Sequence, residues 1–390
     1  KSLQAPVCQQ RLLLDTQPVD ENSTMCQLQG DLSQPLLLTF VRVPQKFVVV
    51  GVGSTVQLLT MQSNSQKFNL EHHKIFHICP QQPQDELDLG DSDSDHGIDF
   101  SGYSDGAQVI CAAIDPGSEQ LLIGSGDPAS LKLLNIQTGH ILHETRLIEL
   151  DGPLQCMAVN WDRDEVVCGC MHRISLWSLQ TWHISISTSA RQGAVSIVVD
   201  WASQRMLAGQ SLGGLTLLSW GSRSRPICGL FVVYSQIQTG SVNCVAADWQ
   251  ANVCMYNDGR EDGEGLILYD LQRRKQIAFL HHRHKDSWAV DLDWTSRRAL
   301  SGTGSDLMLW NLETLQVIHT FKTHQPRVIH FAVDWNTLRA ISVFQHSSLH
   351  LLDLVTGETM QHLEFSGSLG CLHVDWTRSC FIADIVMSKG

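Results

Sequence analysis

The stretch DLDWTSRRALSG (residues 291–302) decides the fold, because it is the clearest of several copies of one phrase. VVDWASQRMLAG (198–209) and AVDWNTLRAISV (332–343) are close copies, and four weaker copies are present. The aligned acidic or amide residues are Asp115, Asn160, Asp200, Asp248, Asp293, Asp334 and Asp375. Successive copies are 40 to 48 residues apart. A repeat of this length, rich in short apolar runs, is typical of the blades of a β-propeller.

Residues 287–324 show how one blade is built. SWAVDLDW is apolar and mostly alternating, so it predicts the inner strand, and a four-residue turn joins it to a second strand, ALSGTG. LMLWNL and QVIHTFKTH predict the third strand and the outermost strand. Four such strands form one antiparallel sheet. Because a single sheet cannot bury both of its faces, neighbouring copies must stack around an axis.

The chain is therefore predicted to form a single all-β domain over residues 1–390. We expect complete blades at 33–79, 107–150, 154–190, 195–239, 242–285, 287–324 and 328–365. The two ends, 1–32 and 366–390, each hold two further strands, and we expect 8–30 to pair with 371–387. Such a closing blade, shared by both termini, would remove free sheet edges. The predicted count is eight blades, and seven is the alternative if one terminal half packs elsewhere.

Four of the predicted third strands share an ending. They read LWSL (176–179), LYDL (268–271), LWNL (309–312) and LLDL (351–354). These endings resemble the WD40 repeat family, whose third strand typically ends in Trp-Asp. The resemblance covers nearly the whole chain and implies a closed WD40-like propeller, although Asp-Trp stands where the family usually has Ser-Pro. It also implies a side-chain network in blade 287–324, formed by His284, Ser301 or Thr303, Asp306 and Trp310.

The overall composition bounds the function classes. The 390-residue chain carries a formal net charge of −13, whereas nucleic-acid binding needs a basic stripe, so we expect no nucleic-acid partner. No apolar run approaches the ~20 residues that span a bilayer, so we expect no transmembrane segment. Charged residues make up only 17%, which favours a surface partly covered by other proteins. The chain begins at Lys1, and a removed targeting peptide is an alternative.

The positions of the cysteines indicate the compartment. Cys111, Cys156, Cys244 and Cys371 all lie four residues before the repeated Asp or Asn. That position belongs to the face of the inner strand that carries small residues, which suits close stacking of blades. We therefore expect buried, unpaired thiols and an intracellular location in the cytoplasm, with an organelle matrix or stroma as the alternative.

An acidic segment, residues 81–106, interrupts the repeat and is predicted to be a surface insertion. We expect it to contact a partner protein. Its candidate contact residues are Asp85, Glu86, Asp88, Asp91, Asp93, Asp95 and Asp99. The alternative is a calcium site formed by Asp91, Asp93, Asp95 and Asp99. However, His96 stands where a calcium loop usually has Gly, and Gly102 stands where it usually has an acid.

The repeated Asp predicts turn chemistry, because Asp at the start of a tight turn bonds its own backbone. In three copies an Arg follows five residues later, and a cross-hairpin pair would neutralise each acid. The pairs are Asp200 with Arg205, Asp293 with Arg298, and Asp334 with Arg339. A ring of these carboxylates around a cation is the alternative.

The densest basic run is a second candidate partner contact. Its residues are His281, His282, Arg283, His284 and Lys285. A loop of this charge suits an acidic partner. Zinc is the alternative here and at Cys168, Cys170 and His172, but neither run has the usual ligand spacing.

No catalytic motif such as GxSxG, HExxH or a phosphate-binding loop is present. We therefore expect a non-catalytic scaffold without cofactor, acting as a fixed subunit of a multiprotein complex. Peripheral association with a membrane complex is compatible with this prediction. The alternatives are a regulatory adaptor that reads a peptide at the channel mouth, and an enzyme that uses channel carboxylates and a metal.

Overall fold

The computed structural model describes most of the strands and tight turns of the chain. The described backbone covers 10–14, 17–18, 38–42, 46–52, 55–64, 67–77, 109–375 and 380–386, with gaps at 116–117, 119, 127–128, 148–151, 171, 190–193, 212–213, 221–230, 237–240, 258–264, 283–286, 305, 323–327, 345–347, 366–367 and 376–379. For the described backbone within 109–365, side chains are described as well, except at 189, 231–236 and 287–288. Beyond 365, side chains are described at 372 and 374.

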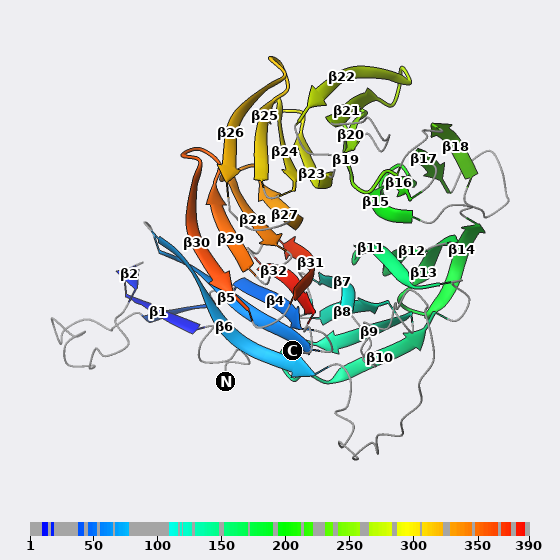
Figure 1. Cartoon of the computed structure of the whole chain (residues 1–390). Coiled ribbons are helices and arrows are strands. Elements are labelled where there is room, and N and C mark those ends of the chain that lie inside the picture. Colours follow the sequence, from blue (N-terminus) through cyan, green and yellow to red (C-terminus); the bar gives the residue numbers. More distant parts are fainter. Residues whose placement is uncertain are drawn as a thin grey trace, which may run out of the picture.

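Six four-stranded antiparallel sheets, blades 1 to 6, are arranged around a central axis (Figure 1). In each blade the strands follow chain order, from the inner first strand to the outermost fourth strand. Blade 1 contains β7 (Val109–Ile114), β8 (Gln120–Ser125), β9 (Ser130–Asn135) and β10 (Ile141–Arg146). Blade 2 contains β11 (Leu154–Asn160), β12 (Glu165–Cys170), β13 (Arg173–Ser178) and β14 (His183–Ser189). Blade 3 contains β15 (Ala194–Asp200), β16 (Arg205–Gln210), β17 (Gly214–Ser219) and β18 (Phe231–Gln236).

The other three blades continue the same order. Blade 4 contains β19 (Val245–Asp248), β20 (Val253–Asn257), β21 (Gly265–Asp270) and β22 (Lys275–His281). Blade 5 contains β23 (Ser287–Asp293), β24 (Arg298–Thr303), β25 (Asp306–Asn311) and β26 (Gln316–Lys322). Blade 6 contains β27 (Val328–Asp334), β28 (Arg339–Phe344), β29 (Ser348–Asp353) and β30 (Glu358–Glu364). The predicted inner, second, third and outer strands of each repeat are therefore present.

Two kinds of turn recur from blade to blade. In the turn after the first strand of blades 2 to 6, a side-chain oxygen of the repeated Asp or Asn accepts a backbone N–H three residues on, as Asp293 does from Ser296. The turn then closes on a residue with a positive φ of 51° to 56°, at Asp164, Gln204, Asn252, Arg297 and Leu338. The turn after the third strand also ends in a positive φ, at Gly139, Trp182, Arg274, Leu315 and Gly357. Because strands alternate in direction, both turns lie at the same end of every blade.

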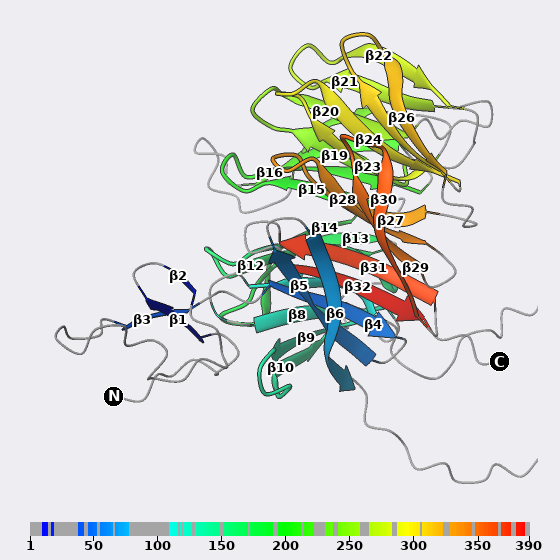
Figure 2. The same ribbon diagram turned by 90° about the vertical axis from the view of Figure 1, so that its left-hand side faces the viewer.

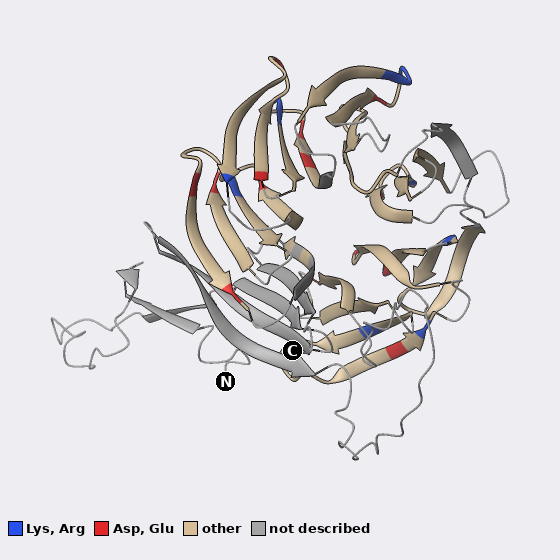
Figure 3. Ribbon diagram, in the orientation of Figure 1, with Lys and Arg blue, Asp and Glu red and all other residues tan. Residues whose placement is uncertain are grey.

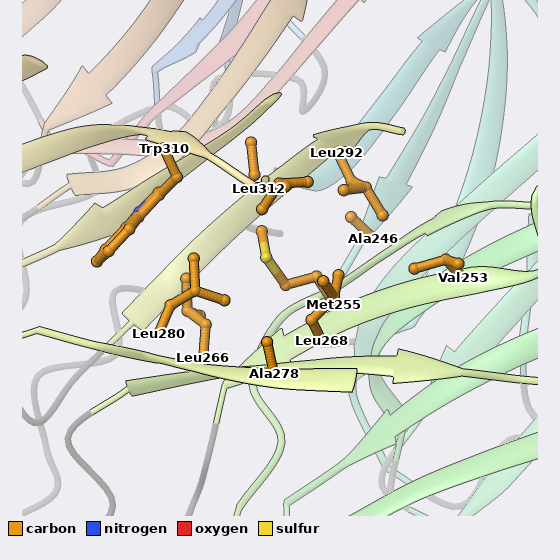
Figure 4. Packing of buried hydrophobic residues seen from close by; sticks show 11 residues of the cluster. Ala246, Val253, Met255, Leu266, Leu268, Ala278, Leu280, Leu292, Trp310 and Leu312 are labelled. Carbon is orange, nitrogen blue, oxygen red and sulfur yellow. The ribbon is translucent and has the colours of Figure 1, made fainter. Parts of the chain in front are cut away.

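The core lies between blades. The cluster in Figure 4 joins Met255, Leu266 and Leu268 of blade 4 to Leu292 and Trp310 of blade 5. Comparable clusters join blades 1 and 2, 2 and 3, 3 and 4, and 5 and 6. Each sheet therefore buries both faces only through its two neighbours, as the repeat predicts.

The inner ends of neighbouring blades approach most closely at a glycine of the second strand. A Cβ atom added to Gly169 would lie 2.6 Å from Sγ of Cys156 and 2.7 Å from Cδ1 of Ile197 in the next blade. A Cβ atom on Gly302 would lie 2.7 Å from Cγ1 of Val328, also in the next blade. These glycines leave the space into which the next inner strand packs.

A five-stranded sheet combines strands from near both ends of the chain. Its order is β31 (Ser368–Asp375), β32 (Cys380–Val386), β4 (Lys46–Val52), β5 (Thr55–Asn64) and β6 (Lys67–His77). β31 contacts β27 on one side and β7 on the other, so this sheet lies between blade 6 and blade 1.

The predicted pairing of 8–30 with 371–387 is wrong. β32 pairs in parallel with β4, whereas β1 (Gln10–Leu14) pairs with β2 (Gln17–Pro18) and β3 (Leu38–Arg42) in a small separate sheet (Figure 2). The reason is that the strand expected to begin blade 33–79 pairs with β1. This leaves the β4 edge open, and the two C-terminal strands occupy it.

The described part of the chain is thus a β-propeller with six four-stranded blades, and the predicted count of eight is not confirmed. No helix occurs in this part, and so none that could cross a membrane.

The close approach at Gly169 generates a stability prediction. Gly169→Ala should lower the free energy of unfolding by about 1–3 kcal/mol, because the new methyl group overpacks a filled space. Denaturant unfolding followed by tryptophan fluorescence measures the loss. Removing the nearest atom with Cys156→Ala in the same chain should restore part of it. Full stability of the single variant would contradict the close packing.

Candidate interaction surface on the outer strands

Exposed apolar side chains gather on one kind of element. Eight large apolar residues in the described part are exposed, by 39% to 61%, and all eight lie on a fourth strand or in the turn that leads to it. They are Ile141, Leu142, Ile277, Leu315, Val317, Ile318, Val355 and Met360. The fourth strand has a neighbour on only one side within its sheet, so this surface follows the outer rim of the propeller (Figure 1).

Four of these eight residues are the extra residue of a β-bulge. In the pairing of β25 with β26, Leu309 faces His319 and Trp310 faces Val317, so Ile318 is the extra residue of β26. The same count makes Leu142, Ile277 and Met360 the extra residues of β10, β22 and β30. Each lies seven positions after the last residue of the third strand. The outward apolar residue is therefore a repeated feature of the blade.

The bulge also determines how a partner can bind. An edge strand offers unpaired N–H and C=O groups to any other strand, and bulges interrupt that template. A bulge at the same place in every outer strand therefore disfavours extension of the sheet by a further strand. What it leaves for a partner is the apolar side chain at the bulge.

Charge divides this surface by blade (Figure 3). The turn before β22 in blade 4 exposes Arg273, Arg274 and Lys275, of which Arg273 is paired with Asp270 at 2.9 Å. The corresponding turns of blades 5 and 6 expose Glu313 and Glu358. The apolar rim is thus basic at blade 4 and acidic at blades 5 and 6.

Beneath this rim, the face of blade 6 buries an unusual histidine. His350 is 8% exposed, neither ring nitrogen has a hydrogen-bond partner among the described residues, and its ring lies 4.7 Å from that of Phe344. Burial, and secondarily the neighbouring His362, lowers the pKa of His350 to about 4. Nearer the axis, burial raises the pKa of Asp291 to about 6, although hydrogen bonds from backbone N–H groups of Leu292 and Val333 oppose the rise.

Of the partner contacts predicted from sequence, few can be placed. The acidic residues of 81–106, including the calcium candidates Asp91, Asp93, Asp95 and Asp99, lie outside the described residues, as do Arg283, His284 and Lys285. His281 is exposed at the end of β22, and its ring lies 4.4 Å from that of Phe279. His282 is 5% exposed, which does not fit the expected partner contact, and that contact stays a prediction. Its alternation with His281 across the strand turns it inward.

The predicted Asp–Arg pair is present in blade 3. Nε of Arg205 donates to Oδ2 of Asp200 at 2.9 Å, and the other guanidinium nitrogens donate to Oδ1 of Asn252 at 2.9 Å and the carbonyl of Trp249 at 3.4 Å. The guanidinium also lies over the Trp249 ring, 4.8 Å from its centroid. Burial alone would raise the pKa of Asp200, but hydrogen bonds from Arg205 and Ser203 outweigh it and lower the pKa. Arg205 thereby fastens blade 3 to blade 4.

In blades 5 and 6 the repeated Asp accepts hydrogen bonds within the turn that follows it. Oδ2 of Asp293 accepts from the Ser296 hydroxyl at 2.6 Å, and Oδ2 of Asp334 accepts from the Thr337 hydroxyl at 2.7 Å. Arg298 and Arg339 lie directly opposite these acids in the strand register, and the ion pairs expected of them stay predictions.

The Trp310 network resolves to one of its two candidates. Nε1 of Trp310 donates to Oγ of Ser301 at 2.9 Å, so Ser301 rather than Thr303 is the partner. The predicted thiols can be followed at three positions: Cys111 and Cys156 are partly buried, Cys244 is buried, and none of the three forms a disulfide. Burial raises the pKa of Cys244 to about 12. The side chain of Cys371 lies outside the described residues.

No group of three or more His, Cys, Asp or Glu side chains that could hold a metal ion occurs in the described part. The fold defines the chain as a β-propeller protein with an apolar outer rim. No protein-family model matches the chain, and none of the curated proteins compared with it is significantly similar.

The interblade bonds of Arg205 give a first prediction. Arg205→Lys should lower the free energy of unfolding by about 1–3 kcal/mol, because an ammonium group cannot hold Asp200, Asn252 and the Trp249 carbonyl together. Denaturant midpoints measure the loss. The matched control is Arg163→Lys on the exposed turn of blade 2, which should change stability by less than about 0.5 kcal/mol. Equal effects of the two substitutions would count against the interblade role.

His350 gives a prediction on pH. Its folded-state pKa lies below the ordinary value, so the unfolded chain binds a proton between about pH 6.5 and pH 4 that the folded chain does not. Stability is therefore lost as the pH falls through this window, by up to about 3 kcal/mol. Blade 5 has Met308 at the equivalent position, so His350→Met introduces a residue that the fold accepts there. This substitution should remove this part of the acid sensitivity.

The comparison of wild type with His350→Met isolates this effect, because Asp291 is present in both and acts in the opposite direction. Asp291 has a raised pKa, so its contribution is present at low pH and is lost as the pH rises to about 6. The difference in unfolding free energy between the two chains should shrink from about pH 5 to pH 7.5. A difference that does not change with pH would show that His350 has the same pKa in the folded and the unfolded chain.

Proposed function

We propose that this chain is a non-catalytic protein-binding scaffold, built on a WD40-like propeller, that serves as a fixed subunit of a multiprotein assembly. One observation carries the proposal: the exposed large apolar side chains of the described part all lie on the outer strands and their turns. Scattered single exposures are ordinary, whereas an apolar residue exposed at the same bulge in four of six blades is not.

The architecture supports this role because the rim is held rigidly. Blades 2 to 5 each share buried clusters with both neighbours, and blades 1 and 6 each with one, which fixes the outer strands relative to one another. We further propose that the five-stranded sheet acts as a seventh blade and completes the ring. Its contacts with β27 and β7 support this closure.

Thiols that are not in disulfides support an intracellular compartment as part of the proposal. None of six described cysteines forms a disulfide, namely Cys111, Cys156, Cys168, Cys170, Cys244 and Cys254. Thiols survive in reducing compartments, whereas secreted domains usually use their cysteines in disulfides.

The test measures partner capture by the rim. In a native extract, Ile318→Asp together with Met360→Asp should reduce stoichiometric co-purification of partners by at least about tenfold, because truncating apolar anchors weakens an interface by that order. The matched control is Ser185→Asp, which changes the same bulge position of β14, where the residue is already polar. Undiminished co-purification with the rim variant would place the binding surface elsewhere.

A further inference from the structure

Three adjacent blades present one continuous stretch of this rim, here called rim surface 4–6. Its apolar residues are Ile277 of blade 4, Leu315, Val317 and Ile318 of blade 5, and Val355 and Met360 of blade 6. Blades 4 and 5 share the core of Figure 4. Blades 5 and 6 touch at the rim, where a Cβ atom on Gly357 would lie 3.2 Å from Nδ1 of His319.

Charge is graded along this surface at one repeated position. The first residue of each outer strand pairs with the last residue of the third strand: Lys275 with Asp270, Gln316 with Asn311, and Glu358 with Asp353. The position is therefore positive in blade 4, neutral in blade 5 and negative in blade 6, and all three residues are exposed. The residue two positions further on is the apolar bulge residue in each blade, namely Ile277, Ile318 and Met360.

This pattern is complementary to itself. A two-fold rotation about an axis through the middle blade, which has the uncharged Gln316 at this position, exchanges blade 4 of one copy with blade 6 of the other. Lys275 of each copy then faces Glu358 of the other, so the charge contact forms twice. The apolar side chains of the two middle blades meet at the axis.

We propose that rim surface 4–6 binds a second copy of this chain around a two-fold axis through Ile318. The proposal rests on the proposed function, because it names the partner for one part of the outer rim. The bulges disfavour pairing of β26 with β26 through the backbone, so the contact is made by side chains. The net charge of −13 opposes association at long range, so the local opposite charges select the orientation.

The experiment is analytical ultracentrifugation of the purified full chain over a range of concentrations at low and moderate salt. Wild type should show a reversible monomer–dimer equilibrium that salt weakens. Ile318→Asp should raise the dimer dissociation constant by at least about tenfold, since it places two carboxylates at the axis. Leu142→Asp, the same bulge position in blade 1, is the matched control and should leave the constant unchanged.

A charge exchange tests the two-fold arrangement. Lys275→Glu alone and Glu358→Lys alone should each weaken self-association by about tenfold, because each turns both charge contacts into repulsions. In an equimolar mixture of the two variants, both contacts of the heterodimer are again between opposite charges. The mixture should therefore regain the dimer that neither variant forms alone.

The outcomes separate this inference from the proposed function. A wild type that stays monomeric, or a mixture that regains nothing, overturns self-association. If Ile318→Asp with Met360→Asp still abolishes co-purification in that case, the rim binds a different protein and the scaffold function stands. Circular dichroism and the thermal midpoint of each variant exclude loss of folding as the cause.

Discussion

The packing of flat four-stranded sheets around a common axis is the constraint on which the rest of this structure depends. Blades converge toward the axis, so the space between them narrows there and only small groups fit. Gly169 and Gly302 mark the narrow end, where an added Cβ atom would collide with the next blade. Further out the gap widens and is filled by Leu268 and Trp310.

The same constraint explains why function is expected at the rim. The first three strands of each blade are covered by hydrogen-bonded neighbours and adjacent blades, so their side chains are committed to packing. The fourth strand has its free edge on the outside of the propeller, and every described fourth strand carries a bulge. A bulge protects against uncontrolled strand addition and turns one side chain outward. An apolar residue at this place therefore reconciles protection of the edge with specific binding.

The sequence predicted the blades well because the repeat and the strand pattern arise from local physics. The repeated Asp or Asn, followed by Trp in six of the seven copies, marks the first turn, and alternation marks strands such as β23 (Ser287–Asp293). Strand pairing between the chain ends was predicted wrongly, because the edge of β4 could accept more than one partner and periodicity does not choose among them. His282 was assigned to a basic run expected to contact a partner, because composition does not show that this residue is buried.

The outer surface was missed for a related reason. Leu142, Ile277, Ile318 and Met360 lie seven positions after the end of the third strand, a spacing that an alignment of the repeats would show. Alternation alone places each on the buried or exposed face according to register, and the bulge shifts that register by one. Equivalent positions that pack between blades carry similar residue types in every blade. A position at which the residue type differs from blade to blade is therefore not constrained by packing. The charge differs at one such position, which is occupied by Lys275, Gln316 and Glu358. The bulge residue two positions further on is apolar in all three blades. Because the packing positions are alike in all blades, the charge at this surface position is what distinguishes one blade from another to a binding partner.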